Sequence, residues 1–532
     1  MKTSARKIQP ALGIHPVKML LLTVFILFST LSCSPSGEEG AAIVTSDTSA
    51  PVPLIISVEP ECRLAWNSIL QNHPLPEGFV SGAGTESPTQ TQRPIELEIY
   101  AGEPGRIEQS EAAGKDTFLL SREPLIPVVP LLDTRTSIDM QTALQLPLRT
   151  IHEDVLPLKG LPVNGLFIDD EQYPLIRNVF LRFSDKSGTE GSRTDETRRH
   201  ILMEWVRDLQ KTAAGSVEAV EPDVVWVGGV GDMMLQRGIE DIFIARGEQG
   251  LHEIFNDTLP VLRAQDYLIG NLEGAVTEGG IPTPKSYNFR FSPQVLPWLK
   301  SAGFDYVSIT NNHCYDYGTE GFTDTLDHLK RNGIATSGAG LSPEAAFTPY
   351  VTEIRAIPLK VLSVGAYPRE KNGFDGRSQA GVREDRPGII FSGPRVLSVI
   401  RQFSGQDNID IVIAHGGQEW EDTPSDEQKE FYRSCIDAGA DILMAHHPHV
   451  LQGMEAYNGG LIAYSLGNFL FPGMYGMPHA EETILLSIGF VQQHPVYIQP
   501  YPVKIDNREI RLESPDSLIL SRFFELSRAF IF

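Results

Sequence analysis

Residues 439–453 read GADILMAHHPHVLQG. The apolar run ILMA leads directly into three histidines within four residues. A short apolar run bounded by turn residues is typical of a strand buried in a sheet. The same arrangement, an apolar run that ends in polar and chemically active residues, recurs along the second half of the chain. This repeated pattern decides the predicted fold.

Five further segments share the pattern, with helical patterns between them. They are DVVWVGGVGD at 223–232, RAQDYLIGNLEGAVT at 263–277, GFDYVSITNNHCYDYG at 303–318, LKVLSVGAY at 359–367 and NIDIVIAHGGQEW at 408–420. Among the helices, one is expected to begin after Ser425 as N-cap and to bury Cys435. Apolar strands that alternate with helices predict an α/β fold with strands covered on both faces.

Chemically active side chains directly follow five of these strands. They are Asp232, then Asn271 and Glu273, then Asn311, Asn312 and His313, then His415 and Glu419, and finally His446, His447 and His449. In open α/β sheets, sites form beyond the carboxyl ends of the strands. Carboxylate, amide and imidazole donors together suit Mn, Fe, Zn or Mg.

Each motif alone has an ordinary structural explanation as a turn, a helix cap or a loop. A satisfied core histidine explains one histidine easily and three poorly. Five such motifs, each placed just after a strand, predict one shared polar site.

Composition excludes one class of partner. The chain has 532 residues, enough for two or three domains, and a formal charge of −24. Nucleic acid is therefore not expected as a partner, because phosphate binding needs a basic surface. The four cysteines do not form the pattern of a disulfide framework.

The N-terminus predicts export. Basic residues at positions 2, 6, 7 and 18 precede the apolar run MLLLTVFILFSTLSC, which ends at Cys33. This stretch resembles a bacterial lipoprotein signal, with Cys33 as the lipidated residue, although Thr30 stands where that pattern usually has leucine. An ordinary cleaved signal peptide and an uncleaved anchor are the alternatives. The lipoprotein interpretation predicts an exported protein of the bacterial cell envelope, lipid-anchored on the periplasmic or extracellular side of the membrane.

Composition divides the chain into segments. Residues 1–33 are the signal and 34–55 a flexible tether, followed by a smaller α/β N-terminal domain at 56–220. Within this domain, residues 122–146 resemble a hinge-proximal segment of phosphate-type solute-binding proteins. Residues 221–480 hold the strand-end motifs, and 481–532 are expected to complete that domain with strands and an amphipathic helix.

Six motifs occur in the order of a known family. They are VGDMML, NLEGAVT, TNNHCYDYG, AHGGQEW, AHHPHVLQG and YSLGNFLF, between residues 224 and 475. They resemble the CapA family of capsule or poly-γ-glutamate synthesis proteins, whose domain is similar to the calcineurin-like metallophosphatases. The resemblance implies a four-layer α/β sandwich with divalent metal ions at the strand ends.

The resemblance also implies roles for individual residues. The metal ligands would be Asp232, Glu273, Asn312, His415, His447 and His449. The catalytic residues would be His313, as acid or transition-state stabiliser, and Glu419, for which the role of shaping the pocket together with Trp420 is the more strongly expected one. Other pocket residues would be Asn271, Asn311, Trp420, His446 and Asn468, the last of which could instead cap its own backbone.

One feature departs from the phosphatases, which usually open with Asp-x-His. Here Asp232 is followed by Met233 and Met234, and methionine is a poor ligand for a hard metal. Three functions stay open. They are metal-dependent hydrolysis or transfer on an anionic cell-envelope polymer, a non-catalytic role in polymer export or assembly, and a metal-dependent phosphoesterase.

Overall fold

The computed structural model describes residues 224–530, apart from 371–372, 406–407 and 492, together with shorter N-terminal segments. Those segments are residues 41–44, 54–58, 95–101, 117–130, 143, 146, 148–150, 158–160 and 176–184. The expected lipoprotein signal and Cys33 lie outside the described residues. Within the described part, no helix is both long and apolar enough to span a bilayer.

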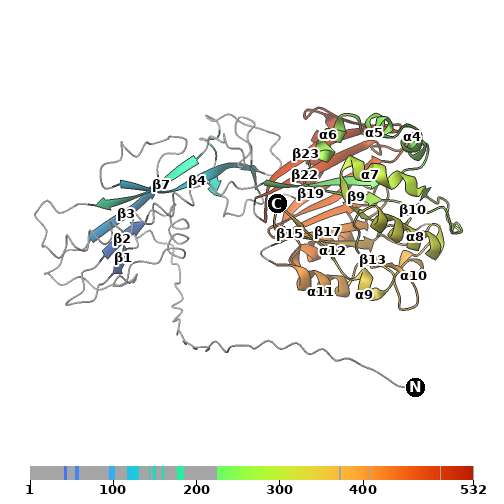
Figure 1. Cartoon of the computed structure of the whole chain (residues 1–532), viewed down its shortest axis with the longest axis horizontal. Helices are drawn as coiled ribbons and strands as arrows, with labels where there is room; N and C mark the ends of the chain where they lie inside the picture. Colours follow the sequence, from blue (N-terminus) through green and yellow to red (C-terminus); the bar gives the residue numbers. More distant parts are fainter. Residues whose placement is uncertain are drawn as a thin grey trace, which may run out of the picture.

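The N-terminal segments form a seven-stranded sheet (Figure 1). Its order is β1-β2-β3-β7-β4-β5, with β6 paired to β4. The strands are β1 (Ala41–Val44), β2 (Leu54–Val58), β3 (Ile95–Ala101), β4 (Thr117–Pro130), β5 (Leu148–Thr150), β6 (Leu158–Gly160) and β7 (Ile176–Ser184). Strand β1, which lies within the expected tether, pairs antiparallel with β2.

The first sheet of residues 224–530 has the order β12-β9-β8-β22-β23-β24, and β21 also pairs with β8. Its strands are β8 (Val224–Met233), β9 (Tyr267–Leu272), β12 (Phe304–Ser308), β21 (Asn468–Leu470), β22 (Glu482–Val491), β23 (His494–Asp506) and β24 (Glu509–Leu512). Strands β12, β9, β8 and β21 run parallel, whereas β22 to β24 are antiparallel. The carboxyl ends of β8, β9 and β12 therefore share one edge.

The second sheet has the order β14-β15-β17-β18-β20-β19. Its strands are β14 (Tyr350–Ile354), β15 (Ile357–Ala366), β17 (Ile409–Gly416), β18 (Ile442–His446), β19 (Leu451–Tyr457) and β20 (Gly460–Leu466). Strands β15, β17, β18 and β20 are parallel, and hairpins add β14 and β19 at the edges. Two short pairs complete the strands, β10 (Ala275–Val276) with β11 (Arg290–Phe291) and β13 (Ala339–Gly340) with β16 (Gly388–Ile389).

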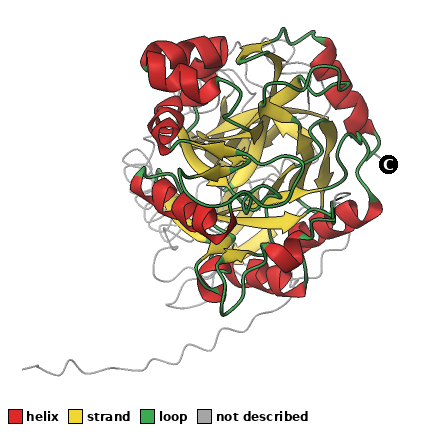
Figure 2. Cartoon of the chain, turned by 90° about the vertical axis from the view of Figure 1, so that its right-hand side faces the viewer, coloured by secondary structure: helices red, strands yellow, loops and turns green. Residues whose placement is uncertain are grey.

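The two sheets pack face to face, and helices cover their outer faces (Figures 1 and 2). On the first sheet lie α4 (Ile239–Arg246), α5 (Glu248–Phe255), α6 (Leu259–Arg263), α7 (Leu296–Ala302) and α8 (Gly318–Arg331). On the second lie α9 (Pro343–Ala346), α11 (Pro394–Phe403) and α12 (Asp426–Asp437). The short α10 (Gly376–Gln379) belongs to the connection between β15 and β17. The predicted four-layer α/β sandwich is confirmed.

The layers meet closely where β8 crosses β18. A Cβ atom on Gly229 would lie 2.2 Å from the sulfur of Met444. Glycine at this position therefore lets the first sheet approach the second beside their carboxyl ends, without displacing a core side chain.

Two helices were placed correctly from local signals. The Ser425 hydroxyl accepts the Gln428 N–H at the start of α12, and Cys435 is fully buried. The C-terminal helix α13 (Leu518–Arg528) buries Phe523 and Phe524 in the core between the sheets, as its amphipathic pattern predicts. Beside it, Lys159 of β6 places its ammonium 5.9 Å from the Phe524 ring centre.

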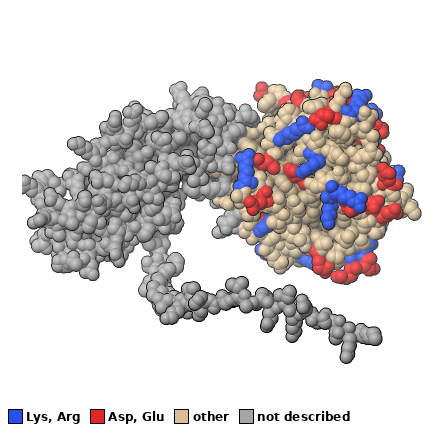
Figure 3. All heavy atoms as spheres, in the orientation of Figure 1, with Lys and Arg blue, Asp and Glu red and all other residues tan. Residues whose placement is uncertain are grey.

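Basic and acidic side chains are interspersed on the surface of residues 224–530 that Figure 3 shows, and uncharged atoms cover most of it. Mixed charge of this kind favours solubility. On this face, no single-sign charged patch identifies a binding surface.

A buried aspartate, Asp410, and a half-buried one, Asp441, lie at the opposite, amino-terminal ends of the second sheet's strands. The Asp410 N–H donates to Asp441 Oδ2 over 2.7 Å, and Asp410 Oδ2 accepts the Gly405 N–H over 3.0 Å. Burial raises the pKa of Asp410 to about 6. Burial, aided by the charge of Asp410, raises the pKa of Asp441 to about 7. The folded protein therefore holds protons here that the unfolded chain releases.

These raised pKa values predict how stability depends on pH. Above the ordinary aspartate pKa near 3.8, the folded state binds more protons than the unfolded state, so the free energy of unfolding falls as pH rises toward about 7. Asp441→Asn keeps the acceptor for the Asp410 N–H and removes one carboxylate. Urea unfolding should show the variant gaining stability relative to wild type between pH 5 and pH 8. A difference between the two proteins that does not change with pH would contradict the assignment.

Candidate metal centre

The structure brings the predicted strand-end residues together where the two sheets meet. Asp232 lies at the end of β8, and Glu273 directly follows β9. The histidines come from the second sheet, with His415 near the end of β17 and His447 directly after β18. The parallel strands of both sheets therefore deliver their last side chains to one place.

Three of the predicted ligands form a compact group. One ligand atom each from Asp232, Glu273 and His449 lies within 4.8 Å of the others. His449 Nδ1 is 3.3 Å from Asp232 Oδ2, and its Nε2 is 3.7 Å from Glu273 Oε1. All three residues are buried. Two carboxylates and an imidazole at these distances form a donor set for a divalent cation.

The other three predicted ligands form an adjoining group. His415 Nε2 is 3.1 Å from Asn312 Oδ1, and the ring centres of His415 and His447 are 4.8 Å apart. The backbone N–H of His447 donates a hydrogen bond to Asp232 Oδ2 over 3.3 Å, and this bond joins the two groups. All six predicted ligands therefore lie around one buried centre.

The backbone at this centre adopts conformations that side chains rarely tolerate. The φ angles of His447, His449 and Trp420 are 101°, 61° and 70°. Each such residue costs about 1–3 kcal/mol, and such residues concentrate at functional sites. The Trp420 N–H donates to the Pro448 carbonyl, and the Trp420 ring lies 5.3 Å from that of His449. The strained turn after β18 and the turn after β17 therefore contact and stabilise each other.

Asparagine side chains orient the ligands. Asn468 donates from Nδ2 to two backbone carbonyls, so its Oδ1 accepts from His449 Nδ1 over 2.9 Å. In its neutral form, His449 then presents Nε2 toward Glu273 as an acceptor. Asn271 donates to Asp232 Oδ1 over 2.8 Å, and Asn311 in turn donates to Asn271 Oδ1 over 3.1 Å. These three predicted pocket residues lie directly behind the candidate ligands.

His313 is held by a residue that sequence reasoning missed. Its Nδ1 lies 2.6 Å from Asp316 Oδ2, which also accepts the Phe289 N–H. Lys285 is buried, with its ammonium 3.1 Å from Asp316 Oδ1 and 3.1 Å from Glu370 Oε1. Because Asp316 accepts from these donors, His313 Nδ1 is also a donor. His313 Nε2 consequently points into the site, 3.8 Å from Glu273 Oε1.

Signals for these missed residues differ in strength. Asp316 follows His313 by three residues inside the motif TNNHCYDYG, and that proximity could have identified it. Tyr367 directly follows β15, so the rule used for the other strands could have flagged it, and its ring lies 5.9 Å from that of His415. Lys285 and Glu370 lie in loops with no such signal.

Two predicted residues lie apart from the central cluster. His446 turns away, because its Nε2 pairs with the backbone carbonyl of Val230 over 2.9 Å. Glu419 is exposed, although its charge acts on both Glu273 and His449. We therefore place Glu419 at the rim and His446 behind the centre.

The two carboxylates of the site have opposite pKa shifts. Burial would raise the pKa of Asp232, but its hydrogen bond with His449 and nearby histidine charges outweigh burial and lower it. Burial and the charge of Asp232 raise the pKa of Glu273 well above its usual range. Asp232 therefore carries a negative charge, and the neighbouring Glu273–His449 pair holds a proton that a cation would displace.

The pKa values of the histidines in the site are also shifted in opposite directions. Burial lowers the pKa of His447 to about 3 and that of His415 well below its ordinary value. Burial also opposes protonation of His449, but the charges of Glu273 and Asp232 overcome it and raise the pKa to about 9. His415 and His447 are thus neutral imidazoles, the form that binds metals, whereas His449 would release a proton to a bound cation.

The residues fit a divalent metal ion. Glu273 Oε1, His415 Nδ1 and His447 Nδ1 are buried and have no hydrogen-bond partner among the described residues. Buried polar atoms without partners are rare and costly. Carboxylate oxygens and neutral imidazoles around one centre are ligands that a cation would satisfy. This donor set suits Mn, Fe, Zn and Mg alike.

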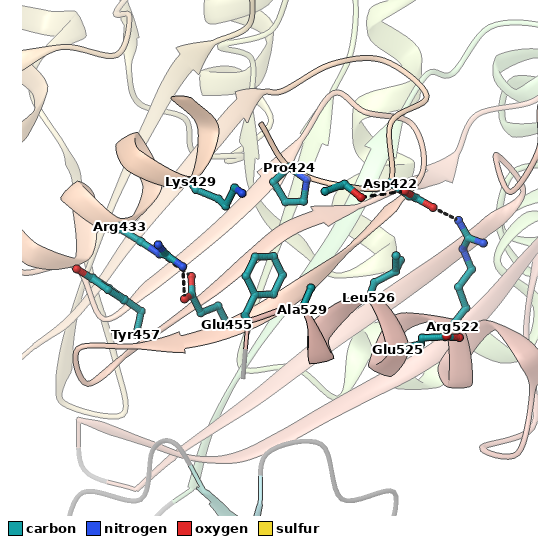
Figure 4. Close-up of a pocket in the computed structure, with 12 residues that line it drawn as sticks. Asp422, Pro424, Lys429, Arg433, Glu455, Tyr457, Arg522, Glu525, Leu526 and Ala529 are labelled. Atoms are coloured by element: carbon teal, nitrogen blue, oxygen red, sulfur yellow. Dashed lines mark hydrogen bonds and ion pairs between the residues drawn. The ribbon is translucent and has the colours of Figure 1, made fainter. Parts of the chain in front are cut away.

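A separate pocket of about 780 Å³ lies between α12, β19, α13 and residues 422–424 (Figure 4). Its arginines are already paired, Arg433 with Glu455 over 2.7 Å and Arg522 with Asp422 over 2.9 Å. None of the predicted site residues lines it. The strand-end cluster is therefore the stronger candidate site.

Comparison with known proteins identifies the family. Residues 227–473 match the family described as bacterial capsule synthesis protein PGA_cap. The PGA biosynthesis protein CapA of Bacillus subtilis (strain 168) is 31% identical over 320 residues, which are 58% of this chain and 81% of that protein. This chain belongs to the PGA_cap family. The resemblance to CapA proteins drawn from the six motifs is confirmed.

Other comparisons each match about half of this chain. The capsule biosynthesis protein CapA of Bacillus anthracis is 29% identical, over 51% of this chain and 65% of that protein. Among solved structures, a novel phosphatase of Mycoplasma pneumoniae aligns with a TM-score of 0.34 and 13% identity, over 54% of this chain and 95% of that chain. A hypothetical protein of Thermus thermophilus has the same TM-score and 17% identity, over 53% of this chain and all of that chain.

The buried Asp316–Lys285 pair should be important for stability. Asp316→Ala removes a buried partner from Lys285 and should lower the free energy of unfolding by roughly 3–5 kcal/mol. The matched control is Asp327→Ala, which removes an exposed aspartate paired with Arg331 and should change stability far less. Urea denaturation of both variants measures the difference. Similar small losses in both would show that the buried pair contributes little.

Proposed function

We propose that this PGA_cap protein acts in the bacterial cell envelope, in capsule or poly-γ-glutamate-type polymer synthesis, by metal-dependent hydrolysis or transfer on the anionic polymer. The observation that carries this proposal is the buried centre of Asp232, Glu273 and His449, with unpartnered donor atoms around it. Relatives named for PGA and capsule biosynthesis support the substrate class. Export with a lipid anchor at Cys33 remains part of this proposal.

Different residues of the chain would have different roles in this reaction. Asp232, Glu273 and His449, with Asn312, His415 and His447, would hold the ion. When bound, a divalent ion supplies Lewis acidity toward a carbonyl or phosphoryl oxygen. His313 is the candidate acid–base group, because Asp316 accepts from Nδ1 and leaves Nε2 facing the site. Nε2 can take a proton from a nucleophile, or give one to a leaving group once it is protonated.

A generic phosphoesterase is a weaker alternative. Asp232 is followed by Met233 and Met234, and both methionines are fully buried in the apolar core. The imidazole of an Asp-x-His motif is therefore not replaced by another ligand at these positions. Turnover of an aryl phosphate faster than of a γ-glutamyl polymer would favour this alternative.

Metal content tests the centre directly. Elemental analysis of the purified full chain, after reconstitution with Mn, Fe or Zn, should find about one or two equivalents of metal. The double variant His447→Ala/His449→Ala should remain folded and lose the metal, whereas His252→Ala, at an exposed histidine, should keep it. Metal-free protein in every case would overturn the metal-dependent reaction.

Replacing His313 separates catalysis from a purely structural role in assembly. His313→Gln should retain metal, because His313 is not assigned as a ligand, and should lower turnover of a poly-γ-glutamate oligomer by about 10²–10⁴-fold. Product formation by chromatography measures the loss. Retained metal with no turnover in either protein would support the export or assembly role.

A further inference from the structure

Arg237 is a basic residue beside the site that the metal centre does not use. Its guanidinium lies 5.9 Å from the centre of the Phe289 ring. The Phe289 ring in turn lies 4.2 Å from the His313 ring. One aromatic ring therefore separates an exposed cation from the candidate acid–base residue.

The protein holds Arg237 in a defined position. Arg237 has a φ of 57°, and its Nη1 donates to the Pro472 carbonyl over 2.5 Å. Arg508 donates from Nε to the Arg237 carbonyl over 2.8 Å. A left-handed backbone at a residue with a side chain persists only where surrounding contacts impose it. Packing on Phe289 and the bond to Pro472 thus fix a long side chain that would otherwise be mobile in solvent.

The guanidinium remains available for an anion. No carboxylate among the described residues forms an ion pair with Arg237, and within that part of the chain only Nη1 has a hydrogen-bond partner. Nε and Nη2 form the edge of the guanidinium that binds a carboxylate through two parallel hydrogen bonds. Lys285, a second cation near the site, has its side chain buried between Asp316 and Glu370 and cannot serve this purpose.

The loops that contact Arg237 also expose aromatic side chains. Tyr287, two residues before Phe289, is 67% exposed, and Tyr475, three residues after Pro472, is 57% exposed. Such rings can pack against the methylene groups of a flexible chain. Exposed aromatic rings and a fixed guanidinium together suit a polymer in which carboxylates alternate with short methylene segments.

We infer that Arg237 binds a carboxylate of the polymer beside the bond that reacts, and so selects a polycarboxylate over a neutral chain. This inference rests on the proposed function, because it assigns the recognition of that same substrate. Arg237 is a specificity residue here. It is neither a metal ligand nor an acid–base group.

Binding to a defined probe tests the inference. Calorimetry on the full chain would compare a poly-γ-glutamate oligomer with the same oligomer carrying methylamidated carboxylates. Arg237→Gln keeps an N–H donor for the Pro472 carbonyl but removes the charge and the paired N–H groups of the guanidinium. This variant should bind the carboxylate oligomer about tenfold or more weakly than wild type. Arg237→Lys, which keeps the charge, should lose less. Arg401→Gln, at an exposed position on α11, lowers the net charge equally and should bind within about twofold of wild type.

The outcomes separate this inference from the proposed function. Unchanged binding by Arg237→Gln would overturn the inference, whatever the metal content. Equal binding of the charged and amidated oligomers by wild type would also overturn it. Arg237-dependent binding by a protein that holds no metal would support the inference while rejecting the metal-dependent reaction. Metal content of Arg237→Gln should equal that of wild type, and a loss there would assign Arg237 a structural role instead.

Discussion

The carboxylate of Asp232 is buried where the two sheets meet, so its hydrogen bonds constrain the whole fold. An isolated charge this deep is strongly unfavourable unless hydrogen bonds compensate it. Its donors come from both sheets, Asn271 from the first and the His447 N–H from the second. The requirement to satisfy one carboxylate therefore sets how the two sheets meet, and it places the ends of their strands around a single centre.

Backbone strain and buried polarity at this centre have one explanation. The left-handed turn at His447 and His449 brings the His447 backbone N–H and the His449 ring to the Asp232 carboxylate. Packing of Trp420 on His449 imposes the turn from outside. Atoms left without partners among the described residues, such as Glu273 Oε1, lie inside this strained shell. Strained backbone angles together with buried polar atoms that lack hydrogen-bond partners indicate a binding site.

The inner and outer sides of the centre are lined by different residues, and this difference affects how a polymer could bind. His313 is backed by Asp316 and by the buried Lys285, so its orientation is rigid on the inner side. Phe289 forms the outer wall, with Arg237 beyond it. The pocket between α12 and α13 has its arginines in ion pairs. An available cation close to His313 makes the strand ends better suited to an anionic chain.

The layered α/β class, most strand positions and the residues that follow the strands could all be predicted from the sequence. These depend on local hydrophobic patterns and on the rule that parallel strands end at one edge. The family resemblance already separated His447 and His449 from His446, and the tertiary structure supplies the physical reason. His446 pairs with the Val230 carbonyl, while His447 and His449 turn toward Asp232, because the packing of other segments imposes the turn after β18. Lys285 and Glu370 could not be predicted from the sequence, because the loops that carry them meet near His313 only after the sheets have packed.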